Sequence, residues 1–297
     1  VLGLEVVMAD GAVVRTGTEA RKTASGYDLT GLFVGSEGTL GLITELTLRL
    51  QGQPEAISAG VCSFDTINQA VAAVIDTIQM GLPMARIEFI DAATVAAVNQ
   101  YSSAGLPELP HLLVEFHGSE AGVAEQSETF GLIVAEHDAH DFKWATQAED
   151  RSALWKMRHT AYYAVLASHP GAGAMVTDIC VPISKLADAV EQTSAEINQS
   201  SIAGPIMGHV GDGNFHAILM IDPEKPDDLK TAKDLSERMV TRALEMGGTA
   251  TGEHGIGVGK LDYMAREHGH GWTVMSSIKR ALDPQDIMNP GKLLRQN

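Results

Sequence analysis

The stretch of residues 208–216 combines two histidines with a sequence that is typical of a tight turn. Residues 211–214 read Gly-Asp-Gly-Asn, and glycine adopts a positive φ without steric cost, so we expect a hairpin here. In that hairpin His209 lies directly opposite His216, with the two Cβ atoms roughly 5 Å apart. This separation suits two imidazoles that bind one metal ion. Two half-buried structural histidines remain the alternative.

A second cluster of polar residues follows downstream, where Glu253 and His254 stand between glycines. Glu253 would complete a two-histidine, one-carboxylate site with an open position, a pattern that recurs in catalytic metal sites. Zinc, manganese and iron(II) all accept this ligand set. A divalent ion there could bind the carboxylate and 2-hydroxyl of a hydroxy acid and lower the hydroxyl pKa. His254 is then a candidate general base, with a third metal ligand or a structural donor as alternatives.

Arg158 is the candidate for binding the acid group of a substrate. It lies on a predicted helix over 149–168, with Tyr162 one turn later on the same face. Arginine binds carboxylates through two parallel hydrogen bonds, and the alternative is a solvated helix arginine. Weaker candidates follow at Thr177, Asp178 and Lys185, of which we expect Lys185 at the surface.

Two nucleotide-binding patterns are excluded by the sequence. The glycines of residues 255–260 suggest a phosphate loop, but His254 stands where that motif needs its first glycine, and Leu261 replaces its serine or threonine. No Gly-x-Gly-x-x-Gly run opens a helix after a strand, so a nicotinamide site of the doubly wound type is not expected.

The bulk composition describes a globular protein of two domains. The chain has 297 residues, 44% of them hydrophobic and 20% charged. A net charge of −17 argues against nucleic acid or an anionic membrane surface as the main partner. No apolar run approaches the ~20 residues of a membrane-spanning helix. Cys62 and Cys180 fall in apolar runs, so we expect buried free thiols, with one disulfide as the alternative.

The order of elements predicts an α+β protein with a largely antiparallel sheet. Residues 1–50 contain strand patterns around a glycine-rich loop at 35–41, and residues 51–55 form a linker. Apolar periodicity and capping residues then predict alternating elements. The predicted strands are 57–64, 86–90, 112–116, 142–145 and 175–181; the predicted helices are 66–80, 91–101, 119–136, 149–168, 184–199 (capped by Ser184), 226–246 and two shorter ones after 260.

Seven motifs, taken in order, resemble one protein family. They are GYDLTGLFVGSEGTLG (26–41), RIEF (86–89), LWKMRH (154–159), TDICVPISKL (177–186), GHVGDGNFH (208–216), TGEHGIGVGK (251–260) and MNPGK (288–292). Together they resemble the FAD-linked D-2-hydroxy-acid dehydrogenases and oxidases, and among these the FAD-dependent D-lactate dehydrogenases. The resemblance runs through the whole chain, and the set is specific although each motif alone is not.

This resemblance implies the architecture of the vanillyl-alcohol-oxidase-like flavoproteins. Residues 1–51 would be the C-terminal part of a PCMH-type FAD-binding domain, and residues 52–270 an FAD-linked oxidase C-terminal domain, a cap or substrate domain with a ferredoxin-like antiparallel sheet. Residues 271–297 would return to the flavin domain. The family's N-terminal portion, with its pyrophosphate-binding loop, lies outside this sequence, so we expect the chain alone to bind FAD poorly and to be inactive.

The resemblance also implies roles for individual residues. The divalent metal, zinc or manganese, would be bound by His209, His216 and Glu253. His254 would be the catalytic base and Arg158 the ligand of the substrate carboxylate. The residues expected near the flavin are Gly35, Ser36, Gly38, Thr39, Gly41, Ile43 and Asn289.

The implied reaction is oxidation of D-lactate, or a similar D-2-hydroxy acid, to the 2-oxo acid with hydride transfer to FAD. A cytochrome or quinone would accept the electrons, and a homodimer is the candidate assembly. Glycolate and D-2-hydroxyglutarate are alternative substrates, although the latter needs a further cation and residues 175–178 contain no lysine. A non-catalytic metal-binding fragment is the alternative from another class. The expected location is mitochondrial in a eukaryote, and cytoplasmic or peripherally membrane-associated in a bacterium.

Overall fold

The protein is described from a computed structural model that covers residues 1–20 and 22–295. Its internal contacts divide the chain into two compact units. Unit 1 combines Val1–Gln53 with Glu253–Asn297, and unit 2 is Pro54–Gly252. Along the described residues, no helix is both long and apolar enough to cross a membrane.

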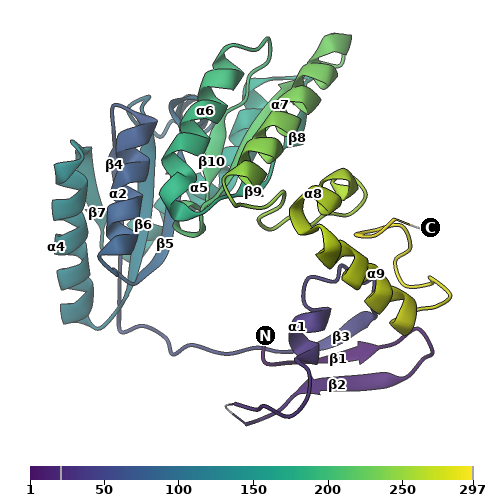
Figure 1. Cartoon of the computed structure of the whole chain (residues 1–297). Coiled ribbons are helices and arrows are strands. Elements are labelled where there is room, and N and C mark those ends of the chain that lie inside the picture. Colours follow the sequence, from purple (N-terminus) through teal and green to yellow (C-terminus); the bar gives the residue numbers. More distant parts are fainter. Residues whose placement is uncertain (21, 296–297) are drawn as a thin grey trace. The chain divides into compact units, whose positions relative to one another are not determined.

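Unit 1 is built on a three-stranded antiparallel sheet in the order β2-β1-β3, with β1 at Gly3–Val7, β2 at Val13–Gly17 and β3 at Leu42–Thr47 (Figure 1). The short helix α1 (Leu29–Phe33) begins at Asp28, whose side chain accepts the N–H of Gly31 at 2.9 Å. This cap satisfies a backbone donor that the helix leaves unpaired.

The C-terminal segment completes the core of unit 1. After a 3₁₀ turn at Leu261–Tyr263, it forms α8 (Met264–His268) and α9 (His270–Leu282). Ile278 and Leu282 of α9 pack against a cluster of Leu4, Val6, Phe33 and Leu40. By internal contacts the division between the units falls after Gly252, whereas the sequence predicts a domain over residues 52–270 followed by a segment over 271–297; Glu37 already accepts the N–H of Ile256 within unit 1.

Unit 2 contains one large sheet in which every pairing is antiparallel. Its order is β7-β4-β6-β5-β10-β11-β8, and β9 pairs with β11. The strands are β4 (Ala56–Ser63), β5 (Met84–Ile90), β6 (His111–Gly118), β7 (His140–Ala145), β8 (Gly173–Val176), β9 (Ile179–Cys180), β10 (Ile206–Gly208) and β11 (Asn214–Ile221).

Helices cover both faces of this sheet. Figure 1 shows α4 (Glu120–Glu136), α2 (Ile67–Gln79), α6 (Leu186–Asn198) and α7 (Pro226–Glu245) side by side along one face. Side chains alternate between faces along a strand, so Phe116 packs on Phe130 of α4 while Leu113 faces the other way. On that second face, α3 (Ala92–Ser102) and α5 (Ala148–Ser168) bury Trp155, Val165 and their neighbours against the strands.

Local capping explains where the predicted helices begin. Thr66 and Gln69 form a reciprocal capping box at α2, and Asp91 accepts the N–H of Thr94 at the start of α3. The prediction that Ser184 caps α6 is wrong, because residues 183–185 form a 3₁₀ turn (Ile183–Lys185) and the helix starts after Lys185. The single strand expected at 175–181 is interrupted, giving β8 and β9. Both cysteines are free thiols, Cys62 buried and Cys180 half-buried.

Candidate metal centre

His209 and His216 come together in unit 2, although not through the expected register. Met207, rather than His209, lies opposite His216 on the paired strands β10 and β11. The predicted register is wrong because residues 210–212 form a 3₁₀ turn that lengthens the loop. Gly213 closes this turn at φ +79°, and a Cβ there would lie 2.1 Å from the carbonyl oxygen of Val181. The two imidazole centroids are nevertheless 5.8 Å apart.

Both histidines have their Nδ1 atoms held by hydrogen-bond acceptors. His209 Nδ1 lies 2.7 Å from Oε1 of Glu88, and His216 Nδ1 lies 3.0 Å from the carbonyl oxygen of Thr177. Carboxylate and carbonyl oxygens accept but do not donate, so each neutral ring carries its proton on Nδ1 and its lone pair on Nε2. Metal-binding histidines are commonly fixed in this way by an acceptor behind the ring. The pair is thus in the tautomer that binds a cation through Nε2.

Glu88 on β5 links this pair to Arg158 on α5. Its second oxygen, Oε2, accepts from Nε and Nη2 of Arg158 at 3.1 and 2.8 Å. The two side chains are only 12% and 11% exposed, and Arg158 Nη1 lies 3.6 Å from Sδ of Met207. The predicted anion-binding residue is therefore not a solvated helix arginine. Glu88 lies within the RIEF motif but was not among the candidates from the sequence. A glutamate in a strand is usually solvent-exposed, and the sequence does not show that α5 covers this one.

A buried polar network surrounds His216. The Asp178 carboxylate accepts from Nδ2 of Asn214 at 2.9 Å and from Oγ1 of Thr251 at 2.6 Å, and its Oδ1 lies 3.8 Å from His216 Nδ1. Thr177 Oγ1 accepts the N–H of Ala217 at 2.8 Å. Thr177 and Asp178, weaker candidates from the sequence, thus support the histidine from behind. Lys185, expected at the surface, is exposed.

Gly252 ends unit 2 against this network. A Cβ at Gly252 would lie 1.5 Å from Asn214 Nδ2 and 3.0 Å from Asp178 Oδ1, so only glycine fits. Glu253 and His254 follow directly in the chain and belong to unit 1. There, Glu253 Oε1 lies 3.6 Å from His254 Nε2, and each side chain is about half exposed, at 47% and 49%.

The glycine-rich loop (35–41) holds most residues expected near the flavin. Gly35 and Gly38 adopt positive φ, at +81° and +73°. Thr39 donates from Oγ1 to the carbonyl of Ser36 at 2.7 Å. Ser36 Oγ is buried and has no hydrogen-bond partner among the described residues. A buried hydroxyl of this kind fits a loop that binds a polar group of a ligand.

The remaining residues expected near the flavin are Gly41 at the end of this loop, Ile43 just after it, and Asn289. Asn289 donates from Nδ2 to the carbonyl of Glu37 at 2.6 Å. Gly41 lies close to β1, where a Cβ would be 2.5 Å from Cγ1 of Val6, and Ile43 packs on the same core cluster. For Gly41 and Ile43 the structure thus gives a packing role.

Glu37 ties the glycine-rich loop to the segment that carries Glu253 and His254. Its Oε1 accepts the N–H of Ile256 at 2.6 Å, and its Oε2 accepts the N–H of Gly257 at 2.8 Å. Hydrogen bonds to an ionised acceptor are stronger than neutral ones. Glu37, which was not among the candidates from the sequence, therefore fixes the loop after His254 within unit 1.

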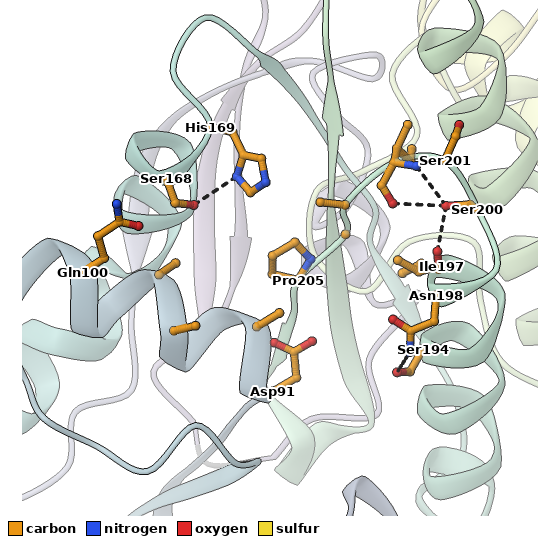
Figure 2. A pocket seen from close by; sticks show the side chains of 16 residues that line it. Asp91, Gln100, Ser168, His169, Ser194, Ile197, Asn198, Ser200, Ser201 and Pro205 are labelled. Carbon is orange, nitrogen blue, oxygen red and sulfur yellow. Dashed lines mark hydrogen bonds between the residues drawn. The ribbon is translucent and has the colours of Figure 1, made fainter.

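A separate cavity of about 520 Å³ lies between α3, α6 and the loop before β10. Figure 2 shows Asp91 on one side of it, with His169 across the space near the end of α5. Burial raises the pKa of Asp91 to about 6, against hydrogen bonds from Thr94 that lower it. None of the residues expected to bind metal, flavin or substrate lines this cavity.

Comparison with known proteins identifies the family. Residues 53–293 match the family described as FAD linked oxidases, C-terminal domain. The chain belongs to this family. The resemblance inferred from the seven motifs is thereby confirmed.

Relatives with curated names share much of the sequence. The chain is 47% identical to "Probable D-lactate dehydrogenase, mitochondrial" of Danio rerio, over 99% of this chain and 60% of the relative. It is 44% identical to "D-lactate dehydrogenase [cytochrome], mitochondrial" of Arabidopsis thaliana, over 99% and 52%. It is 34% identical to "Glycolate oxidase subunit GlcD" of Bacillus subtilis (strain 168), over 100% and 63%. The chain spans between about half and two thirds of the length of these relatives.

Solved structures share the fold at low sequence identity. 4-Ethylphenol oxidase from Gulosibacter chungangensis superposes with a TM-score of 0.76 at 20% identity, over 99% of this chain and 65% of that one. p-Cresol methylhydroxylase gives 0.76 at 17% identity, over the same shares. With the antiparallel sheets of both units, these likenesses confirm the expected fold class.

Proposed function

We propose that the protein containing this chain oxidises D-lactate, or a similar small D-2-hydroxy acid, to the 2-oxo acid with FAD as the hydride acceptor. The observation that carries this proposal is that Glu88 accepts hydrogen bonds from both Arg158 and His209, which would bind the substrate's carboxylate and a cation respectively. The family and the names of the relatives support the same reaction class.

His209 and His216 would bind a divalent cation, zinc or manganese, through their Nε2 atoms, with Glu253 as the third ligand. Support comes from the Nδ1–H tautomer of both rings and from their 5.8 Å separation. Gly252 lies against Asn214 and Asp178, which belong to the polar network around His216. Glu253 is the next residue in the chain after Gly252. The ion, when bound, supplies Lewis acidity toward the substrate's 2-hydroxyl.

FAD would be held in part by the glycine-rich loop, where the buried Ser36 Oγ fits a polar group of the cofactor. When bound, the cofactor would supply the hydride acceptor for C2 of the substrate. Gly35, Gly38, Thr39 and Asn289 shape the same loop.

The chain's own side chains would orient the substrate and move one proton. The Arg158 guanidinium binds the carboxylate through paired N–H groups. A ring nitrogen of His254 accepts the proton of the 2-hydroxyl as the C2–H bond breaks, so that a C=O double bond replaces the C–O single bond. These two roles separate recognition of the acid group from the proton transfer.

A second candidate substrate is glycolate, because relatives named as glycolate oxidase subunits cover nearly the whole chain at 32–34% identity. D-2-hydroxyglutarate would need an additional cation, and residues 175–178, in β8 and directly after it, contain no lysine. A cytochrome is the proposed electron acceptor, as in the name of the Arabidopsis thaliana relative, and a mitochondrial location is proposed if the source is a eukaryote. A homodimer and a non-catalytic metal-binding role remain predictions from the sequence.

The decisive experiment is a panel of D- and L-2-hydroxy acids on the full-length protein with an artificial electron acceptor. We expect D-lactate to reduce the dye, L-lactate to fail, and a chelator to remove the activity until Mn²⁺ or Zn²⁺ is restored. Faster turnover of glycolate would select the second candidate. Absence of turnover with every acid, in a protein that carries FAD, would favour the non-catalytic role.

A further inference from the structure

The contacts of Glu88 place one carboxylate between two groups with separate tasks. Oε1 accepts from Nδ1 of His209, and Oε2 accepts from both Nε and Nη2 of Arg158. The three residues come from different elements: Glu88 from β5, Arg158 from α5, and His209 from the loop after β10. A carboxylate that is 12% exposed and fully engaged in this way cannot rotate without losing one of its two partners.

We propose that Glu88 is a positioning residue that couples the metal ligand His209 to the substrate-binding Arg158. This inference rests on the proposed function. By accepting a hydrogen bond from Nδ1–H, Glu88 keeps Nε2 of His209 as the lone-pair atom that would face a cation. The same carboxylate adds electron density to the ring and raises its strength as a ligand.

Glu88 also determines which edge of the Arg158 guanidinium is left for the substrate. A guanidinium offers two paired edges, one made of Nε and the near Nη and one made of the two terminal nitrogens. Glu88 takes the first edge through Nε and Nη2. Nη1 points toward the sulfur of Met207, on the strand that leads to His209. The edge formed by Nη1 and Nη2 is therefore the one assigned to the substrate's carboxylate.

A neighbouring glutamate provides a matched comparison. Glu115 on β6 is 4% exposed and also faces α5, where it accepts from Nε1 of Trp155. Its other partners are Arg86 and His117, at 3.4 and 2.8 Å. Glu115 is thus buried like Glu88 and also has an arginine partner, Arg86. Among the described residues, these contacts include neither the proposed metal ligands nor Arg158.

The test is calorimetric titration of Mn²⁺ into the metal-free chain, for the wild type, Glu88→Ala, Glu88→Gln and the control Glu115→Gln. We expect Glu88→Ala to weaken Mn²⁺ binding about 10- to 100-fold, the usual effect of losing such a supporting partner. Glu88→Gln should recover part of this loss, because its amide oxygen can still accept from Nδ1–H of His209. Glu115→Gln should bind like the wild type. Circular dichroism on each variant shows that it is folded.

In the full-length enzyme, Glu88→Gln should also raise KM for D-lactate more than it lowers kcat, because Arg158 loses its charged partner. Glu88→Ala binding Mn²⁺ within twofold of wild type would overturn the inference while leaving the metal centre intact. An equal loss of Mn²⁺ affinity in Glu115→Gln would overturn it too, because the loss would then arise from disturbed packing beneath α5 and not from the contacts of Glu88. A wild-type chain that takes up no Mn²⁺ would remove the metal centre itself and this inference with it.

Discussion

Arg158 donates from Nε and Nη2 to a single oxygen of Glu88, although the two residues are far apart in the sequence. This pair fixes α5 against β5 on the face of the sheet that also carries His216. Breaking a buried ion pair by removing one partner commonly costs 3–5 kcal/mol, because the remaining charge is left buried. The Arg158 side chain is therefore held in place before any ligand arrives.

Replacing Arg158 by lysine should impair substrate binding, because an ammonium cannot donate to Glu88 and to a substrate carboxylate through two paired edges. We expect kcat/KM for D-lactate to fall about 100-fold in the full-length protein, mainly through a higher KM, corresponding to about 2.7 kcal/mol. Arg86→Lys is the control, since Arg86 lies on β5 and stacks over Trp155, which is on α5 like Arg158. Unchanged KM in Arg158→Lys would mean that another residue binds the acid group.

His254→Ala should abolish turnover while leaving FAD bound. General-base catalysis contributes roughly 10²–10⁴-fold, so kcat should drop by at least two orders of magnitude. The measurement is steady-state dye reduction together with the flavin absorbance of the purified full-length protein. His270→Ala, an exposed histidine of the same unit, should keep normal activity. If His254→Ala retains turnover, the base is a different group.

Glu37→Ala should loosen the loop that follows His254. The variant removes the acceptor of two backbone N–H groups, those of Ile256 and Gly257. We expect faster amide hydrogen exchange at these two residues and a loss of stability on the order of 2–3 kcal/mol. The comparison is Glu45→Ala, an exposed carboxylate on β3. Equal exchange rates in Glu37→Ala and wild type would show that these contacts do not hold the loop.

Asp91→Asn should change how stability depends on pH. Burial raises the pKa of Asp91 to about 6, so the folded state holds this proton more tightly than the unfolded chain does. The stability from the neutral carboxyl is fully present below about pH 4 and is lost as pH rises through about 6. Two pKa units correspond to a difference on the order of 3 kcal/mol.

Asparagine also caps helices, so Asp91→Asn keeps the N-cap of α3 without the titration. Its stability relative to wild type should therefore increase between pH 4 and pH 7 in denaturant unfolding. The exposed Asp234→Asn should follow the wild-type profile. A constant difference between Asp91→Asn and wild type over this range would contradict the buried-carboxyl account.

Local chemistry made much of the fold predictable. Thr66 and Asp91 mark the starts of α2 and α3 because their side chains cap the helices themselves. The register between His209 and His216 was not predictable, since a 3₁₀ turn at residues 210–212 and the close approach of Gly213 to Val181 lengthen the loop. The register of this hairpin depends on tertiary contacts, such as that with Val181, which the sequence of the turn does not indicate.

Long-range partners account for the other differences. Glu88 gains these two partners only when α5 brings Arg158 over β5 and the loop after β10 brings His209 alongside. The carboxylate of Glu37 likewise accepts hydrogen bonds from backbone groups more than two hundred residues later in the chain. Motif spacing indicated the candidate site residues, whereas these contacts determine how each side chain is held.

The most direct test of the metal centre is an anomalous difference map from a crystal of this protein soaked with Mn²⁺ or Zn²⁺. We predict a single strong peak about 2.0–2.2 Å from Nε2 of both His209 and His216. The Nδ1 atoms should remain hydrogen-bonded, that of His209 to Glu88 and that of His216 to the carbonyl oxygen of Thr177. A map with no peak between these rings, in crystals that bind the ion elsewhere, would contradict the assignment of His209 and His216 as metal ligands.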